Sequence, residues 1–289
     1  MKIVIANIWL MGTGGTECWC WAMADELRRR GHDVALYTPN PGRFLERTGH
    51  RVASPGEPFD LVLDNHGVSL GKFGGITIHT CHGVIPAECP MPTADANVAV
   101  SKRAAQRWGL KDIITNGVDT DRFRNITEPG DALRRVLSLC KSKTADAMLA
   151  ESCRIAGVEL RTTFGRESFD VENLINGADL VVGVGRSLLD AMSCARPVVS
   201  FDDRDYLAIR YHGGGYIRRD QYRLAAEDSF TGASTWKSWD AASLAGELKK
   251  YNHADGYRNR LWIIKNHSVA ASADKYLKIY GEICGKTEK

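Results

Sequence analysis

Two glycine-containing segments of the chain could bind the phosphate groups of a ligand. The first runs from Gly12 to Glu17 and lies between an apolar run and a helical pattern, and the second, Gly183 to Met192, repeats this order. A helix N-terminus presents unpaired N–H groups and a positive dipole end, and glycine lets an anion approach the main chain closely. Both segments therefore predict anion sites, although the first could also be a tight turn without a ligand.

Charged side chains accompany the second segment. Arg186 opens the predicted helix, where a cation is unfavourable unless an anion binds there too, and Ser187 could be the N-cap. Asp190, one turn later, could meet ribose hydroxyls or be solvated. Lys141 and Lys143 follow another predicted strand, at the end where open α/β sheets bind ligands. They could neutralise a leaving diphosphate, or they could be ordinary exposed loop lysines.

Histidines and cysteines suggest catalysis more than metal binding. His79 and His82 lie at the end of a predicted strand; alternation places His79 inward, and His82 could donate to a substrate oxygen or transfer a proton. The eight cysteines are scattered without paired spacing, which predicts neither a disulfide framework nor a zinc site. We expect buried, reduced thiols and no bound metal.

A nicotinamide cofactor is disfavoured by the first glycine segment. The dinucleotide fingerprint needs a third glycine where Glu17 stands, and it needs an acid near the end of the second strand, where the chain has Tyr37 and Thr38. We expect no cofactor, and a nucleotide in this protein would be a substrate.

The elements that position these residues alternate between strands and helices, which is typical of a parallel sheet covered on both faces. Ser101 is the predicted N-cap of the second helix, and a polar linker over residues 119–131 separates two such units. We expect strands at 2–7, 33–38, 61–64, 77–80, 97–100, 113–114, 135–139, 158–162, 180–184 and 197–201, and helices at 16–30, 102–108, 144–157, 171–176, 187–194 and in the tail 241–283.

Length and charge agree with two globular domains. The chain has 289 residues, which suggests two domains. Its formal net charge is only +3, which does not indicate nucleic acid as a partner and does not exclude it. No apolar stretch reaches the ~18 residues of a membrane span. We expect a cytoplasmic protein, with peripheral membrane association left open.

Four segments in register resemble one enzyme family. They are Gly14 to Glu17, Ala99 to Gly109, Ile114 to Phe123 and Ala178 to Asp202. The chain is similar to the retaining glycosyltransferases of sequence family four. This resemblance implies the GT-B fold, an α/β architecture in which two Rossmann-like, doubly wound domains face a cleft. We expect an N-terminal acceptor domain at 1–124, a donor domain at 125–265, and a helix returning to the first domain at 266–289.

The resemblance also implies roles for single residues. Gly14 and Gly15 would border the donor phosphates, and Lys141 and Lys143 would be basic residues of the donor site. Gly185, Arg186, Ser187 and Leu188 would hold the diphosphate, Asp190 would bind ribose, and His82 would lie near the transferred sugar. The implied reaction moves a sugar from a nucleotide-sugar donor, UDP- or GDP-linked, with retention and without a metal.

Departures from the family leave the donor sugar and the acceptor open. The family often carries a glutamate where this chain has Val182, and a second one where it has Asp190. The alternatives are a nucleotide-sugar epimerase on the same fold and an inactive protein that binds sugar nucleotides. A glycan, a lipid, a protein and a modified nucleobase all remain open as acceptors.

Overall fold

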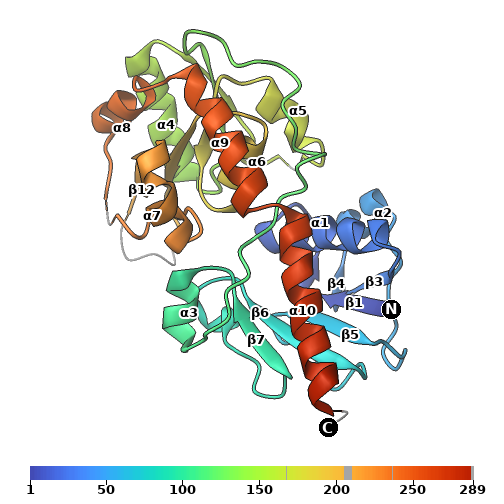
Figure 1. Cartoon of the computed structure of the whole chain (residues 1–289). Coiled ribbons are helices and arrows are strands. Elements are labelled where there is room, and N and C mark those ends of the chain that lie inside the picture. Colours follow the sequence, from blue (N-terminus) through green and yellow to red (C-terminus); the bar gives the residue numbers. More distant parts are fainter. Residues whose placement is uncertain (167, 205–209, 236, 288–289) are drawn as a thin grey trace. The chain divides into compact units, whose positions relative to one another are not determined.

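The computed structural model describes residues 1–166, 168–204, 210–235 and 237–287 (Figure 1). They form two compact units: unit 1 comprises Met1–Asp119 and the chain from Ser268 onward, and unit 2 comprises Thr120–His267. Val118 and Ser268 form a β-bridge within unit 1. The units therefore divide at 119/120 and 267/268, whereas the sequence places the boundaries at 124/125 and 265/266.

Unit 1 is built on a five-stranded parallel sheet in the order β3-β1-β5-β6-β7. The chain order of these strands reverses between β1 and β5, and doubly wound sheets bind ligands at the carboxyl ends of the strands beside such a switch point. The strands are mostly buried, as expected for a sheet covered on both faces. Their bounds are β1 Lys2–Ala6, β3 Asp33–Tyr37, β5 Leu61–Asn65, β6 Ile76–Cys81 and β7 Ala96–Ala99.

The other elements of unit 1 flank this sheet. The predicted N-cap is confirmed, because the Ser101 hydroxyl accepts a hydrogen bond from the N–H of Ala104 at the start of α3. The predicted strand at 113–114 is only a single bridge between Ile113 and Ala99. The bounds are α1 Gly15–Arg29, α2 Arg43–Thr48, α3 Lys102–Trp108, α10 Val269–Thr287, the 3-10 helix η1 Pro86–Glu88, and the short strands β2 Trp9–Leu10 and β4 Asn40–Pro41.

Helix α10 is an integral part of unit 1, and it runs along α1 and β6 (Figure 1). The fully buried Tyr276 hydroxyl lies 2.9 Å from Thr80 Oγ1, and its ring lies edge-on to Trp19. Gly117 permits the close approach, because a Cβ at this position would lie 2.5 Å from the Cα of Val269. The segment around Gly117 therefore packs against the final helix.

Unit 2 repeats the architecture in the order β12-β11-β10-β8-β9, with a switch point between β8 and β10. Four strands are parallel and β12 is antiparallel to β11. The bounds are β8 Arg135–Ser138, β9 Glu159–Thr162, β10 Leu180–Gly183, β11 Val198–Asp202 and β12 His212–Tyr216, with α4 Lys143–Ala156, α5 Val171–Asn176, α6 Arg186–Ser193, η2 Arg219–Gln221, α7 Tyr222–Glu227, α8 Ala241–Leu248 and α9 His253–Asn266.

The core of unit 2 includes Val182, the position at which the family that the sequence resembles often has a glutamate. Val182 is fully buried and packs in one cluster with Leu149, Val199 and Phe201. A carboxylate there would be costly without a partner, so an apolar side chain suits this position. Among the described residues, no helix is long and apolar enough to cross a membrane.

Candidate functional site

The start of α6 lies at the switch point of unit 2, directly after β10. Gly185 is its N-cap and has a φ of 64°, in the left-handed region that favours glycine, and its N–H donates to the Phe230 carbonyl at 3.0 Å. The prediction of Ser187 as N-cap is wrong, because α6 begins at Arg186 and Ser187 already lies in its first turn. Leu188 is fully buried and donates its N–H to the Gly185 carbonyl.

Arg186 and Asp190 form an ion pair on α6. Arg186 Nε lies 2.8 Å from Asp190 Oδ1, and the two side chains are only 8% and 6% exposed. Burial raises the pKa of Asp190, and the nearby Arg186 lowers it by less. Arg186 Nη1 is buried and has no hydrogen-bond partner among the described residues. Asp190, expected to bind ribose, is therefore held by Arg186, which keeps one nitrogen available to a ligand.

Lys141 and Lys143 lie at the same end of the sheet, Lys141 in the loop after β8 and Lys143 as the first residue of α4. Both are exposed, and neither ammonium group forms an ion pair within the described part of the chain. The Lys141 N–H donates to Asp202 at the end of β11, at 3.3 Å, and Ser142 caps α4. The β8 and β10 strands are neighbours, so this loop and the start of α6 share one end of the sheet.

Two aspartates at this edge were not predicted. Asp202 accepts from Arg204 as well as from Lys141, and Asp203 accepts from Arg210 Nε at 2.7 Å and from Thr144 at 2.6 Å. The hydrogen bond from Arg210 is the main reason why the pKa of Asp203 lies well below its usual range. These contacts tie the start of α4 to the segment after β11. The sequence signal for Asp202 and Asp203 was their position at the end of an apolar strand.

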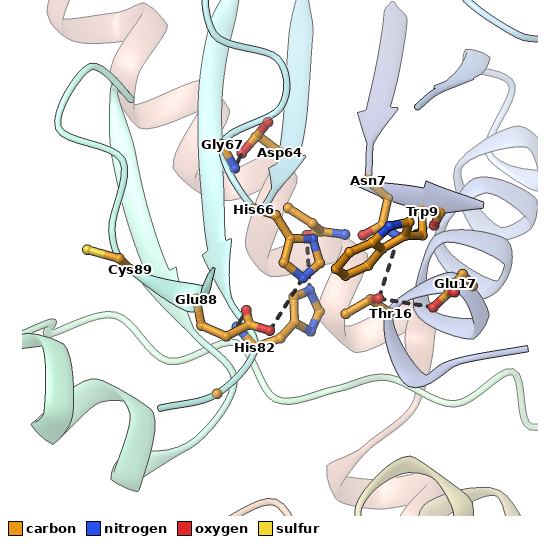
Figure 2. A network of polar contacts seen from close by, with 12 residues as sticks. Asn7, Trp9, Thr16, Glu17, Asp64, His66, Gly67, His82, Glu88 and Cys89 are labelled. Carbon is orange, nitrogen blue, oxygen red and sulfur yellow. Dashed lines mark hydrogen bonds and ion pairs between the residues drawn. The ribbon is translucent and has the colours of Figure 1, made fainter. Parts of the chain in front are cut away.

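The switch point of unit 1 carries a second polar network (Figure 2). Asn7 follows β1 and Asn65 ends β5, and His82 follows β6. The His82 ring lies with Nε2 3.0 Å from Asn65 Oδ1, and Trp19 packs edge-on against it. The backbone N–H of His82 donates to Glu88 Oε2 at 2.8 Å. His82 is half-buried where the parallel strands end, and Asn65 and Trp19 hold its ring from two sides.

His79 is a structural residue, as its alternation in the strand predicts. It is 1% exposed, its Nδ1 lies 2.7 Å from Asp64 Oδ2, and its Nε2 lies 3.0 Å from the Cys89 carbonyl. Asp64 also accepts from the N–H groups of Gly67 and Ser69 and so fixes the turn after β5. The role of this pair is to hold that turn.

The first glycine segment is covered by its own carboxylate. Gly14 is the N-cap of α1, and a Cβ there would lie 2.3 Å from Glu17 Oε2. The Thr16 hydroxyl donates to the same carboxylate at 3.1 Å (Figure 2). A negative side chain in the first turn is favourable for the helix dipole. A phosphate could approach Gly14 and Gly15 only if the Glu17 side chain moved away.

Three further residues of unit 1 were not predicted from the sequence. Trp9, in β2, is 47% exposed, and its ring centroid lies 6.1 Å from that of His66. His66 Nε2 lies 3.4 Å from Glu88 Oε1, and the two side chains are 6% and 10% exposed. Burial alone would raise the pKa of Glu88, but the hydrogen bond from His66 and the neighbouring His82 lower it overall. These contacts join segments that are far apart in the sequence, so no local sequence pattern predicts them.

Metal ligands and thiols complete the inventory of reactive groups. Among the described residues, no group of three or more His, Cys, Asp and Glu side chains is placed to hold a metal ion. All eight cysteines are free thiols, and five of them are buried. Burial is the main cause that raises the pKa of Cys81, Cys153 and Cys194 to about 12.

Comparisons with known proteins show the fold. No protein-family model matches the chain, and no curated protein sequence matches it significantly. Among solved structures, AviGT4, a glycosyltransferase involved in avilamycin A biosynthesis, is 16% identical, with a TM-score of 0.61 over 98% of both chains. A UDP-N-acetylglucosamine 2-epimerase candidate from Listeria monocytogenes is 12% identical, with a TM-score of 0.56 over 96% of this chain and 94% of that one.

The catalytic domain of starch synthase IV from Arabidopsis thaliana, solved with ADP and acarbose, is 10% identical, with a TM-score of 0.54 over 98% and 99% of the chains. The predicted fold class is thereby confirmed: this is an α/β protein with two Rossmann-like sheets that matches GT-B structures. A glycosyltransferase and an epimerase candidate share this architecture, so the fold is GT-B and the reaction has to be argued from the site.

Proposed function

We propose that this protein is a glycosyltransferase that uses a nucleotide-sugar donor, UDP- or GDP-linked, and transfers the sugar with retention and without a metal. One observation carries the proposal: the start of α6 combines Arg186, which has a buried and unpartnered nitrogen, with the N–H groups of a helix N-terminus at the switch point of unit 2. A buried cationic nitrogen needs an acceptor, and a diphosphate supplies one.

The surrounding charges fit a diphosphate leaving group. No acceptor among the described residues takes the N–H groups of Arg186 and Ser187, while Lys141 and Lys143 follow the neighbouring strand and expose their ammonium groups. In the proposed reaction, the bond between the anomeric carbon and the phosphate oxygen breaks while the anomeric carbon binds the oxygen of an acceptor hydroxyl, whose proton passes to the departing diphosphate. Negative charge builds on the diphosphate, and preorganised donors and cations stabilise it in the transition state.

Asp190 would recognise the ribose of the same donor. Its carboxylate is one helical turn from the N-terminus of α6, and Arg186 now occupies one of its oxygens. If Arg186 turned toward the diphosphate, Asp190 would be released to accept ribose hydroxyls. His82, at the switch point of unit 1, would contact the transferred sugar.

Thermal unfolding with nucleotides and nucleotide sugars tests this proposal. We expect UDP or GDP, and the matching nucleotide sugar, to stabilise the protein in buffer containing EDTA. A ligand at 100 times its Kd stabilises by about 2.7 kcal/mol, which a melting experiment resolves. The stabilising donor is then incubated with glycan, lipid, protein and nucleobase acceptors, and the anomeric configuration of the product is read by NMR.

Each outcome bears on one part of the proposal. No stabilisation by any nucleoside diphosphate would overturn it. Epimerisation of the donor without an acceptor would identify an epimerase, and tight donor binding without turnover would identify a binding protein. Stabilisation that appears only with Mg²⁺ or Mn²⁺ would contradict the metal-independent mechanism.

A further inference from the structure

We propose that Trp9, His66 and Glu88 form a binding site for the ring of a neutral carbohydrate. This identification of the acceptor as a sugar rests on the proposed function. The site lies in unit 1, at the switch point between β1 and β5, where the chain order makes a ligand site expected. All three residues belong to unit 1.

Trp9 supplies an apolar face. Its indole is 47% exposed, while Trp19 in the same unit is 2% exposed. Figure 2 shows the indole beside the His66 ring, and the ring centroids are 6.1 Å apart with a tilt of 58°. A large aromatic side chain costs free energy when it is left in water, and it is a rigid platform for a flat ligand face. The C–H face of a pyranose is such a surface.

His66 supplies an unsatisfied polar atom beside this platform. Its side chain is 6% exposed, and Nδ1 is buried without a hydrogen-bond partner among the described residues. The residue has a φ of 68°, which is uncommon for any residue except glycine and costs free energy. Asp64 holds the following turn in place. The fold thus maintains a strained residue whose ring nitrogen lacks a partner, and a ligand hydroxyl would satisfy it.

Glu88 contacts the other nitrogen of this imidazole. Its Oε1 lies 3.4 Å from His66 Nε2, and its Oε2 accepts from the His82 N–H. With the ring proton on Nε2, toward the carboxylate, Nδ1 is the nitrogen that accepts a hydrogen bond from a hydroxyl. Both positions of the imidazole would then be used, one by the protein and one by the sugar.

The chemistry of the cluster favours a neutral sugar over a phosphorylated ligand. Its side chains are an indole, two imidazoles, an amide and a carboxylate, from Trp9, His66, His82, Asn65 and Glu88. None carries a fixed positive charge, and the carboxylate would repel a phosphate. Sugars instead present hydroxyl groups to such acceptors and an apolar face to an aromatic ring.

Saturation-transfer NMR with methyl α- and β-glycosides of glucose, galactose and mannose, without a donor, tests this site. We expect binding by the wild-type protein and about tenfold weaker binding by Trp9→Ala, whereas Trp9→Phe keeps most of it. His66→Asn should also weaken binding, since asparagine tolerates a positive φ and the backbone is kept. Met11→Ala is the matched control, because Met11 is a neighbouring apolar side chain that is 55% exposed.

Three results would overturn the inference. The first is the absence of saturation transfer to any glycoside. The second is an equal loss of glycoside binding in Met11→Ala, which would indicate a general apolar surface. The third is uridine binding that depends on Trp9 more than glycoside binding does. Donor-induced thermal stabilisation reports the proposed function separately. Glycoside binding without donor stabilisation would refute the proposed transferase and leave this site, and the reverse result would refute the site alone.

Discussion

Replacing Arg186 with methionine should destabilise unit 2 strongly. The variant leaves the Asp190 carboxylate 6% exposed and without the guanidinium that lies 2.8 Å from it. Removing one member of a buried pair costs about 3–5 kcal/mol, because the other charge stays buried and uncompensated. At about 2–4 °C per kcal/mol for a unit of this size, the melting temperature should fall by roughly 6–20 °C.

Differential scanning calorimetry of the full chain measures this loss, and the protein contains its own control. Arg154 and Glu151 on α4 lie 2.6 Å apart, but their side chains are 73% and 45% exposed. Exposed pairs contribute little, so Arg154→Met should melt like the wild type. The double variant Arg186→Met/Asp190→Leu should recover most of the loss, since it removes both charges.

Equal melting temperatures for Arg186→Met and Arg154→Met would refute this reasoning. They would show that Asp190 is protonated or hydrated at neutral pH and does not depend on Arg186. A loss in Arg186→Met that the double variant does not recover would instead assign the effect to packing around α6.

Three further predictions concern activity, acid stability and thiol reactivity. Lys141→Ala should keep the fold and lose a factor of ~100 or more in transfer rate, whereas the exposed Lys249→Ala in the same unit should be unaffected; comparable rates would remove Lys141 from the mechanism. Burial and the neighbouring Arg28 lower the pKa of His50 to about 4, so below its ordinary value of about 6.5 the unfolded chain takes up a proton that the native protein does not. The free energy of unfolding should therefore fall as the pH is lowered from about 6.5 to 4, and more steeply than in His50→Gln. Parallel pH curves for the two proteins would contradict this. A thiol reagent at pH 8 should label the exposed Cys89 rapidly and the five buried cysteines only on unfolding. Cys89→Ser should remove the fastest phase of labelling. Fast labelling of Cys140 in Cys89→Ser would disprove the burial of Cys140.

Local patterns were sufficient to predict most of the parallel strands and the helices between them. Strands buried on both faces are continuous apolar runs, and α3 has a serine N-cap and a glycine stop that are visible in the sequence. The strand β12 was missed because its glycines carry no apolar pattern. Gly213 lies so close to the Ser200 carbonyl that a Cβ would be 1.9 Å from it, so this strand depends on backbone contact.

The candidate sites were predictable only in part, because their contacts join distant residues. The glycine at 185 and the lysines after β8 follow strand ends, which are readable in the sequence. The pairing of Arg186 with Asp190 follows from their spacing of four residues, but its burial does not. Trp9, His66 and Glu88 come from three segments that are far apart in the sequence, and the positive φ of His66 has no sequence signature.

The composition of unit 1 from two distant segments has a consequence for biosynthesis. Unit 2 is continuous and is complete before the ribosome reaches α10, whereas unit 1 lacks a helix that covers Trp19 and Thr80 until then. At about 5–20 residues per second, the first segment waits on the order of 10 s for that helix. The nascent N-terminal segment is thus an incomplete domain that exposes core surface to chaperones, and a fragment ending near residue 119 would need α10 supplied as a separate peptide to fold.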